Sequence, residues 1–187
     1  GGRFGCRRTR WDAQGGGASV GGVRDGEVCV LDRAVDFNDY GWRWENSWNY
    51  YSGLYGKEWI YSTVPNFGGR SALTGVLDFY ANGHLGALAS RNRGELVGYG
   101  TSPEGVENNE AVYEVISAAG WSSRRIDVLR LLHDYSRARY GKSVRGVDRF
   151  WRGMLGSAYG EFTNHARFRW QLRPLTRRMP TMGSNDD

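Results

Sequence analysis

The sequence has few of the features that mark the commonest chemical sites. Among its 187 residues there are only two cysteines, Cys6 and Cys29, which is too few for a disulfide framework. No zinc-ligand spacing, phosphate-binding glycine loop or GxSxG nucleophile motif occurs. We therefore expect neither metal nor nucleotide chemistry. Cys29 lies in the apolar run EVCVLD and is expected to be a buried, small hydrophobic residue.

Long apolar runs and a strong charge excess are also missing. No stretch has the roughly 20 apolar residues that a membrane-spanning helix needs, and no signal peptide is visible. Lysine and arginine exceed aspartate and glutamate by 25 to 20, a surplus that is small for a nucleic-acid footprint. Arginines after residue 123 are interpreted as solvated helix faces, with a polyanion-binding surface as the alternative. We expect neither a membrane nor a nucleic acid as partner.

The N-terminal composition differs from the rest. Residues 1–22 are rich in glycine and arginine and have no apolar period, so we expect them to be poorly ordered or foreign to the native context. Because the chain opens with Gly1-Gly2 instead of methionine, we interpret it as a piece of a longer polypeptide.

Short apolar runs predict three strands, at residues 27–32, 58–67 and 95–100. Continuous runs of this kind are typical of strands buried on both faces of a parallel sheet. Between the second and third, residues 71–90 keep their apolar side chains nearly on one helical face. Alternating strands and helices predict an α/β layer over residues 23–122.

The pattern becomes helical after residue 105. Three helices are predicted; the second ends at Gly141 in the position of a left-handed C-cap, and the third opens at Ser143 as an N-cap. The change of pattern near residues 120–125 predicts an all-α region over residues 123–187.

The segment GYGTSPEGVENNEAVYE, residues 98–114, contains a candidate catalytic carboxylate, Glu104. Thr101 and Glu104 fit a capping box, but Pro103 at the first helical position would put Gly105 where the box needs its carboxylate. Alternatively, if residues 95–100 are a strand of a parallel barrel, Glu104 follows its C-terminal end, where barrel enzymes carry reactive groups. For retaining glycoside chemistry it would need a second carboxylate about 5 Å away, and for inverting chemistry a more distant one.

Residues 36–55 contain eight aromatic side chains among asparagine and acidic residues. Rings with polar handles suit a sugar, which has an apolar C–H face and a rim of hydroxyls; the alternative is a loop that packs its rings over the domain. In PNFGGR, residues 65–70, Phe67 is expected to point into the same opening as Glu104. His84, His133 and His165 are interpreted as structural.

Several segments together resemble a known family, the α-N-acetylglucosaminidases. They are EWIYSTVPNFGGR, VGYGTSPEGVENNEAVYE, Gly120-Trp121, YSRARYG and RPLTRRMP, in the family's order and at similar spacing over about residues 22–182. The resemblance implies an exo-acting, retaining glycoside hydrolase that releases terminal α-linked N-acetylglucosamine from glycans or glycosaminoglycans, without a cofactor. It also implies the C-terminal part of a (β/α)₈ TIM-like barrel followed by the start of an all-α domain.

The resemblance also assigns residues. Glu104 of Pro-Glu-Gly matches the catalytic nucleophile, and Asn66 and Phe67 belong to the Asn-Phe-Gly-Gly motif that lines the sugar pocket. His165 is the nearest candidate for a pocket histidine. The family's general acid is a glutamate of an upstream Asn-Glu motif, which no segment before residue 27 matches, so the acid is expected outside this chain.

Two positions depart from the family pattern, since Pro65 and Arg70 stand where relatives often have histidine and asparagine; the edge of the pocket is expected to differ here. A secreted, periplasmic or lysosomal-like location is expected from the family, while the oligomeric state stays open. The alternatives are a non-catalytic carbohydrate-binding protein and an arginine-rich helical module that binds nucleic acid.

Overall fold

The computed structural model describes residues 13–33, 35–37, 46–65, 75–104 and 109–160. Within them a three-stranded sheet has the order β1-β2-β3, with β1 at Cys29–Asp32, β2 at Glu58–Thr63 and β3 at Glu95–Thr101. Both neighbouring pairs are parallel, and a bulge shifts the register of β2 and β3 between Trp59 and Ile60. The three predicted strands and their parallel arrangement are confirmed.

Helices connect the strands, as parallel pairing requires. The connection from β1 to β2 contains the short helices α2 (Val35–Phe37), α3 (Ser47–Tyr50) and η2 (Leu54–Gly56). The connection from β2 to β3 contains α4 (Leu77–Asn82) and α5 (His84–Ala89), where one helix over residues 71–90 was predicted. The break is at Gly83, where a Cβ would lie 2.7 Å from the Phe79 ring.

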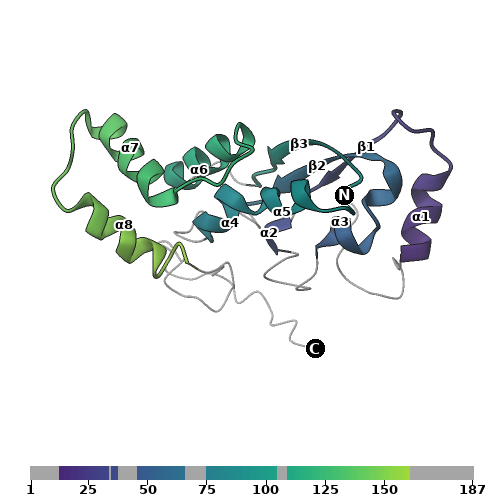
Figure 1. Ribbon diagram of the computed structural model, residues 1–187, viewed down its shortest axis with the longest axis horizontal. Coiled ribbons are helices and arrows are strands. Elements are labelled where there is room, and N and C mark those ends of the chain that lie inside the picture. Colours follow the sequence, from purple (N-terminus) through teal and green to yellow (C-terminus); the bar gives the residue numbers. More distant parts are fainter. Residues whose placement is uncertain (1–12, 34, 38–45, 66–74, 105–108, 161–187) are drawn as a thin grey trace, which may run out of the picture.

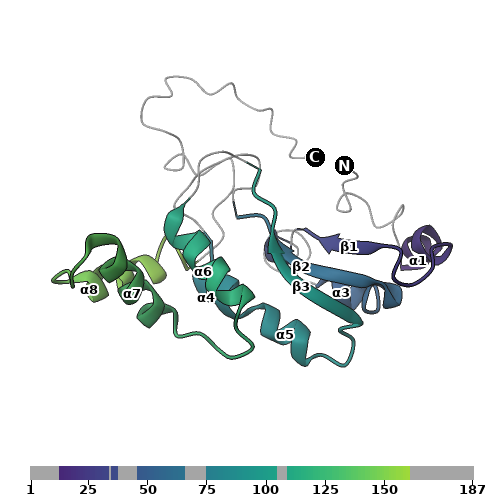
Figure 2. The same cartoon turned by 90° about the horizontal axis from the view of Figure 1, so that it is seen from above.

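Beyond β3 the described chain is helical. Helix α6 (Glu110–Gly120) lies beside α4, and α7 (Val128–Tyr140) and α8 (Val147–Leu155) lie beyond them, at the left of Figures 1 and 2. Gly141 ends α7 with a φ of +69°, so the predicted left-handed C-cap is confirmed. The predicted N-cap at Ser143 is wrong: Gly146 precedes α8 at φ +81°, a conformation that glycine adopts without steric cost.

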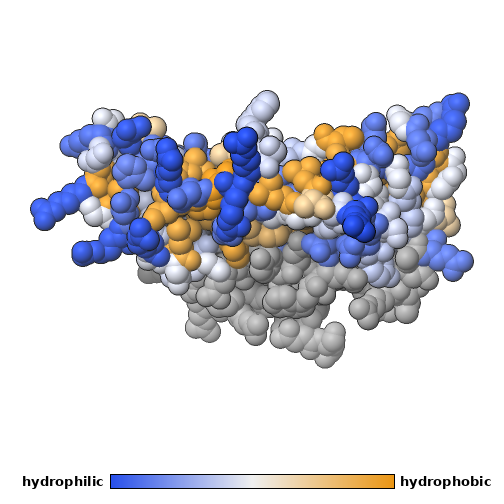
Figure 3. All heavy atoms as spheres, viewed as in Figure 1, coloured by the Kyte–Doolittle hydropathy of each residue, from blue (hydrophilic) through white to orange (hydrophobic). Residues whose placement is uncertain are grey.

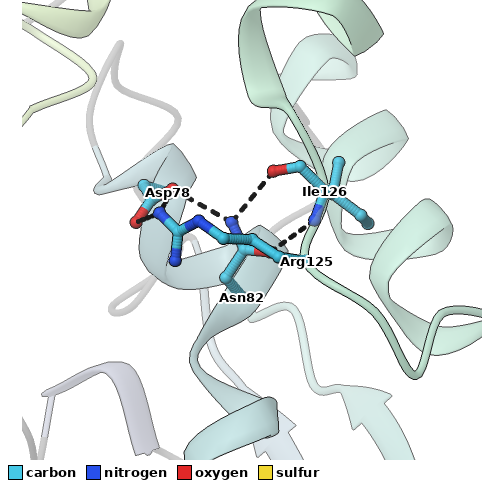
Figure 4. A network of polar contacts seen from close by, with 4 residues as sticks. All are labelled: Asp78, Asn82, Arg125 and Ile126. Atoms are coloured by element: carbon cyan, nitrogen blue, oxygen red, sulfur yellow. Dashed lines mark hydrogen bonds and ion pairs between the residues drawn. The ribbon is translucent and has the colours of Figure 1, made fainter.

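The α/β part and the helices that follow it are joined by the side chain of Asn82, at the end of α4 (Figure 4). Its Nδ2 donates to the carbonyl of Ile126 at 3.2 Å, and its Oδ1 accepts from the N–H of Ile126 at 2.7 Å. Arg125 donates to both oxygens of Asp78, at 2.8 and 3.1 Å. Residues 125 and 126, where the sequence pattern becomes all-helical, are thus bound to α4 by two hydrogen bonds to the Ile126 backbone and by the Arg125–Asp78 ion pair.

Aromatic rings form the centre of the core. Trp48 of α3 stacks on Trp59 of β2 at 6.2 Å, and Tyr61 of β2 stacks on Tyr99 of β3 at 5.8 Å. The ring of buried His84 lies 5.2 Å from that of Tyr99. This ladder fills the helix-covered side of the sheet.

The other side of the sheet is open in the part of the chain that the structure describes. Cys29 is exposed and Leu31 is 48% exposed, so the expectation that Cys29 and its strand are buried on both faces is wrong there. The physical reason is that no described element covers this face of β1, and the side chains of the strand alternate between the covered and the open face.

Part of the glycine-rich N-terminus forms a helix, α1 (Ala13–Gly21), where no order was expected. A Cβ on Gly16 would lie 2.7 Å from the Tyr55 hydroxyl and 3.3 Å from the Tyr51 ring, so the absence of a side chain lets the rings approach the backbone. Residues 1–12 lie outside the described residues, and the prediction for them stays a prediction.

Candidate active site

The C-terminal ends of three parallel strands meet at one edge of the sheet, which we call the catalytic edge because the sequence predicts the catalytic carboxylate there. It comprises Arg33 after β1, Val64 and Pro65 after β2, and the segment from Ser102 to Glu104 after β3. In parallel α/β folds this edge carries ligand sites, because the loops that follow the strands converge there.

Hydrogen bonds extend the pairing of β2 and β3 towards Glu104. The N–H of Ser102 donates to the carbonyl of Thr63 at 2.8 Å, and the Thr101 hydroxyl donates to the same oxygen at 3.2 Å. The hydroxyls of Ser62 and Ser102 lie 3.3 Å apart. The chain is thus anchored to β2 until two residues before Glu104.

Glu104 makes an ion pair across the catalytic edge. Its Oε1 lies 2.5 Å from Nη2 of Arg33, with β2 between the two strands that precede these residues. The Glu104 side chain is 28% exposed and the Arg33 side chain 53%, so the ion pair is accessible to solvent. Helix α6 begins at Glu110 with Asn109 as its N-cap, which makes the capping-box interpretation of Glu104 wrong.

A second carboxylate, Asp36, fixes the loop after β1 to the end of β2. It is fully buried and accepts from the N–H of Val64 at 3.1 and 3.2 Å and from the Tyr80 hydroxyl at 3.1 Å. The Tyr99 hydroxyl donates to the carbonyl of Tyr80 at 3.0 Å. Burial, and then the nearby Asp36 charge, raise the pKa of both tyrosines, which keeps the phenols protonated as donors.

Asp32, the last residue of β1, has an unusual environment. Its carboxylate is buried, and the Ser47 hydroxyl of α3 lies 3.0 Å from each of its oxygens. Burial raises the pKa of Asp32 to about 6, and the hydrogen bond from Ser47 opposes this shift. The group therefore changes charge in mildly acidic solution, on the helix-covered side of the sheet.

The structure describes only part of the aromatic segment, residues 36–55. Trp48 and Tyr51 are buried in the core, which confirms the packing interpretation for these rings. Residues 38–45 lie outside the described residues. His84 is structural, as predicted: its Nε2 lies 2.8 Å from the carbonyl of Ser122, a pairing in which Nε2 donates.

Of the site residues predicted from sequence, the structure describes only Glu104. Asn66, Phe67 and His165 lie outside the described residues, so their roles remain predictions. Among the residues that are described, no group of three or more His, Cys, Asp and Glu side chains could hold a metal ion. Within the same residues, no helix is long and apolar enough to cross a lipid bilayer.

Sequence reasoning missed Arg33 and Asp36. Both follow the apolar run of β1 in the segment LDRAVD, and the same rule that singled out Glu104, a polar residue after a parallel strand, would have found them. The partners could not have been read from the pattern, since 71 residues separate Arg33 from Glu104.

The arginines of the helical region are partly paired. Arg139 of α7 lies 2.7 Å from Glu110 of α6, and Arg137 lies 3.9 Å from Asp134. In Figure 3 hydrophilic side chains project from the face over α7 and α8, at the left. The arrangement favours solvated helix faces over a polyanion-binding surface.

Comparison with known proteins identifies relatives of the chain. Human α-N-acetylglucosaminidase is 29% identical over 143 residues, which are 76% of this chain and 18% of the human protein. A family 89 glycoside hydrolase from Clostridium perfringens, in complex with 2-acetamido-1,2-dideoxynojirimycin, superposes with a TM-score of 0.67 at 26% identity. A variant of the clostridial protein in complex with its substrate GlcNAc-α-1,4-galactose gives the same TM-score at 25% identity.

These relatives are much longer than the chain. The two clostridial structures are matched over 81% of this chain but only 16% of their own length. The three parallel strands and their helices thus correspond to part of a family 89 TIM-barrel domain. The family described as "Alpha-N-acetylglucosaminidase (NAGLU) tim-barrel domain" matches residues 3–123, more than half of the sequence, and the chain therefore belongs to it.

Proposed function

We propose that the chain carries the nucleophile of an exo-acting, retaining α-N-acetylglucosaminidase, and that Glu104 is that nucleophile. The observation that carries the proposal is the position of Glu104, which follows β3 at the catalytic edge of a chain that belongs to this family. The complex of the clostridial relative with GlcNAc-α-1,4-galactose supports a terminal α-linked N-acetylglucosamine as the substrate.

The proposed reaction has two steps. In the first, a carboxylate oxygen of Glu104 bonds to the anomeric carbon, the bond to the leaving oxygen breaks, and a general acid protonates that oxygen. In the second, water attacks the anomeric carbon and gives a proton to the conjugate base of that acid, the bond to Glu104 breaks, and its electron pair returns to the carboxylate. The product keeps the α configuration because two inversions take place.

The wider architecture is part of the same proposal. Residues 23–122 would form the C-terminal part of a (β/α)₈ barrel and residues 123–187 the start of an all-α domain. The exposed face of β1 and the position of Leu31 on it suit a strand that further parallel strands would cover. The acid would come from a part of the enzyme outside this chain.

The nucleophile is identified by covalent labelling in the full-length polypeptide that carries the chain. A 5-fluoro glycosyl fluoride of N-acetylglucosamine should attach to Glu104, as read by peptide mass spectrometry. Glu104→Ala should lower kcat by at least about 10³-fold. Sodium azide should rescue this variant and yield a β-linked azide that is cleaved no further, because the small anion attacks from the face of the missing carboxylate and inverts the anomeric carbon once.

Glu114→Ala is the matched control, since Glu114 is an exposed carboxylate on α6 and should leave turnover unchanged. Label on another residue, or full turnover by Glu104→Ala, would refute the proposal.

A non-catalytic carbohydrate-binding protein is the weaker candidate. Of the aromatic segment on which it rests, Trp48 and Tyr51 are buried in the core, and residues 38–45 lie outside the described residues.

A further inference from the structure

Arg33 and Glu104 bring opposite charges together at the catalytic edge. The guanidinium comes from the first residue after β1 and the carboxylate from the segment after β3, and Nη2 and Oε1 are 2.5 Å apart. An arginine stays charged at every pH at which a protein is folded, so this partner is a permanent positive charge.

The backbone on both sides of Arg33 is anchored by buried carboxylates. Asp32 is held beside Ser47 of α3, and Asp36 is held by the N–H of Val64 and the Tyr80 hydroxyl. Because neighbouring side chains of a strand point to opposite faces, burying Asp32 on the helix side turns Arg33 away from it. The guanidinium is half exposed, yet the chain that carries it is fixed.

We propose that Arg33 is a positioning residue for Glu104. The Arg33 guanidinium holds the Glu104 carboxylate between turnovers and stabilises the carboxylate when it returns to its charged form. The inference rests on the proposed function. During attack Glu104 loses its negative charge to the bond with the anomeric carbon. During hydrolysis that bond breaks and the electron pair returns to the carboxylate, beside the Arg33 guanidinium. Arg33 therefore lowers the barrier of the second step and makes Glu104 a better leaving group.

This role has a kinetic signature that loss of folded protein does not have. Without the positive charge, hydrolysis of the glycosyl-enzyme slows, while its formation does not. Both kcat and KM then fall together, kcat/KM changes little, and the covalent intermediate accumulates. A variant that simply folds less well loses kcat and kcat/KM equally.

The test uses Arg33→Gln in the full-length polypeptide and an aryl α-N-acetylglucosaminide as substrate. We expect kcat to fall by about tenfold or more, KM to fall with it, and intact mass spectrometry of quenched enzyme to show the N-acetylglucosaminyl adduct. Arg33→Lys should restore most of kcat because an ammonium keeps the charge. Arg24→Gln is the control: Arg24 forms an ion pair with Glu27, ahead of β1 at the opposite edge, and its removal should change neither constant.

The outcomes separate the two proposals. If the fluorosugar labels Glu104 in the wild-type enzyme and Arg33→Gln has wild-type kinetics, only the role of Arg33 is overturned. The same holds if kcat and kcat/KM fall together with no adduct. If the wild-type enzyme is not labelled at Glu104, the proposed function fails and the role of Arg33 fails with it.

Discussion

At the scale of single residues, Asp32 makes the stability of the fold depend on pH. Its buried carboxyl has a pKa of about 6 in the folded protein, against 3.8 for the free side chain. Between these values the folded state keeps a proton that the unfolded chain has lost. The stability that this proton provides is therefore present at low pH and is lost as the pH rises through 6. A difference of two pKa units corresponds to about 3 kcal/mol at most.

Asp32→Asn should remove this pH dependence, because an amide has no proton to lose. The free energy of unfolding of the variant, relative to the unmodified chain, should be level below about pH 4 and rise by up to about 3 kcal/mol between pH 4 and 6. Urea unfolding followed by tryptophan fluorescence at several pH values measures it. Ser47→Ala should enlarge the effect, because the Ser47 hydrogen bond opposes the shift. Two parallel stability curves would contradict the assignment.

At the scale of elements, two loops ahead of the strands are packed backbone to backbone. Gly53 precedes η2 at φ +67° and Gly94 precedes β3 at φ +55°. A Cβ on Gly94 would lie 2.2 Å from the carbonyl oxygen of Gly53. The Trp59 indole donates to the carbonyl of Arg93 at 2.7 Å, so these loops also close one end of the aromatic core. This edge of the sheet is opposite the catalytic edge.

Gly94→Ala should therefore destabilise the fold by about 2 kcal/mol or more, because it adds a steric clash to an unfavourable φ. Gly86→Ala is the matched control within α5, where a Cβ meets nothing within 4 Å. It should raise stability by up to about 1 kcal/mol, the helix preference of alanine over glycine. Thermal unfolding followed by circular dichroism compares the two. Equal effects of both substitutions would show that the loops do not touch as described.

At the scale of the whole molecule, the chain corresponds to only a small part of its relatives. It spans 16% to 18% of the relatives that it matches. Retaining glycoside hydrolysis needs two carboxyl groups about 5 Å apart, one to attack and one to protonate the leaving oxygen. Our proposal assigns one of them, Glu104, to this chain.

The purified 187-residue chain should accordingly release no phenol from an aryl α-N-acetylglucosaminide, whereas the full-length polypeptide should release it. A continuous absorbance assay with Glu104→Ala as the blank measures the difference. Turnover by the short chain above that blank would mean that a second carboxyl within these residues supplies the acid.

Local sequence patterns were sufficient for most elements and for the position of Glu104 after β3. The apolar runs marked β1, β2 and β3, and Gly141 marked the end of α7. Glu104 was found because a polar residue after a parallel strand lies at a predictable edge. The patterns failed where the outcome depended on neighbours: Cys29 is exposed because no described element covers its face of β1, and α8 begins at a glycine turn instead of at Ser143.

By itself, then, the sequence determined the three strands, the helical region after β3, the family, and the position of Glu104 after a strand, because each of these depends on residues close together in the chain. Only the tertiary structure decided which residues interact. Arg33 forms an ion pair with Glu104, the N–H of Val64 donates to Asp36, and the Ser47 hydroxyl donates to Asp32. Such contacts join side chains that are distant in sequence, and they form only when parallel strands bring their C-terminal ends to the same edge.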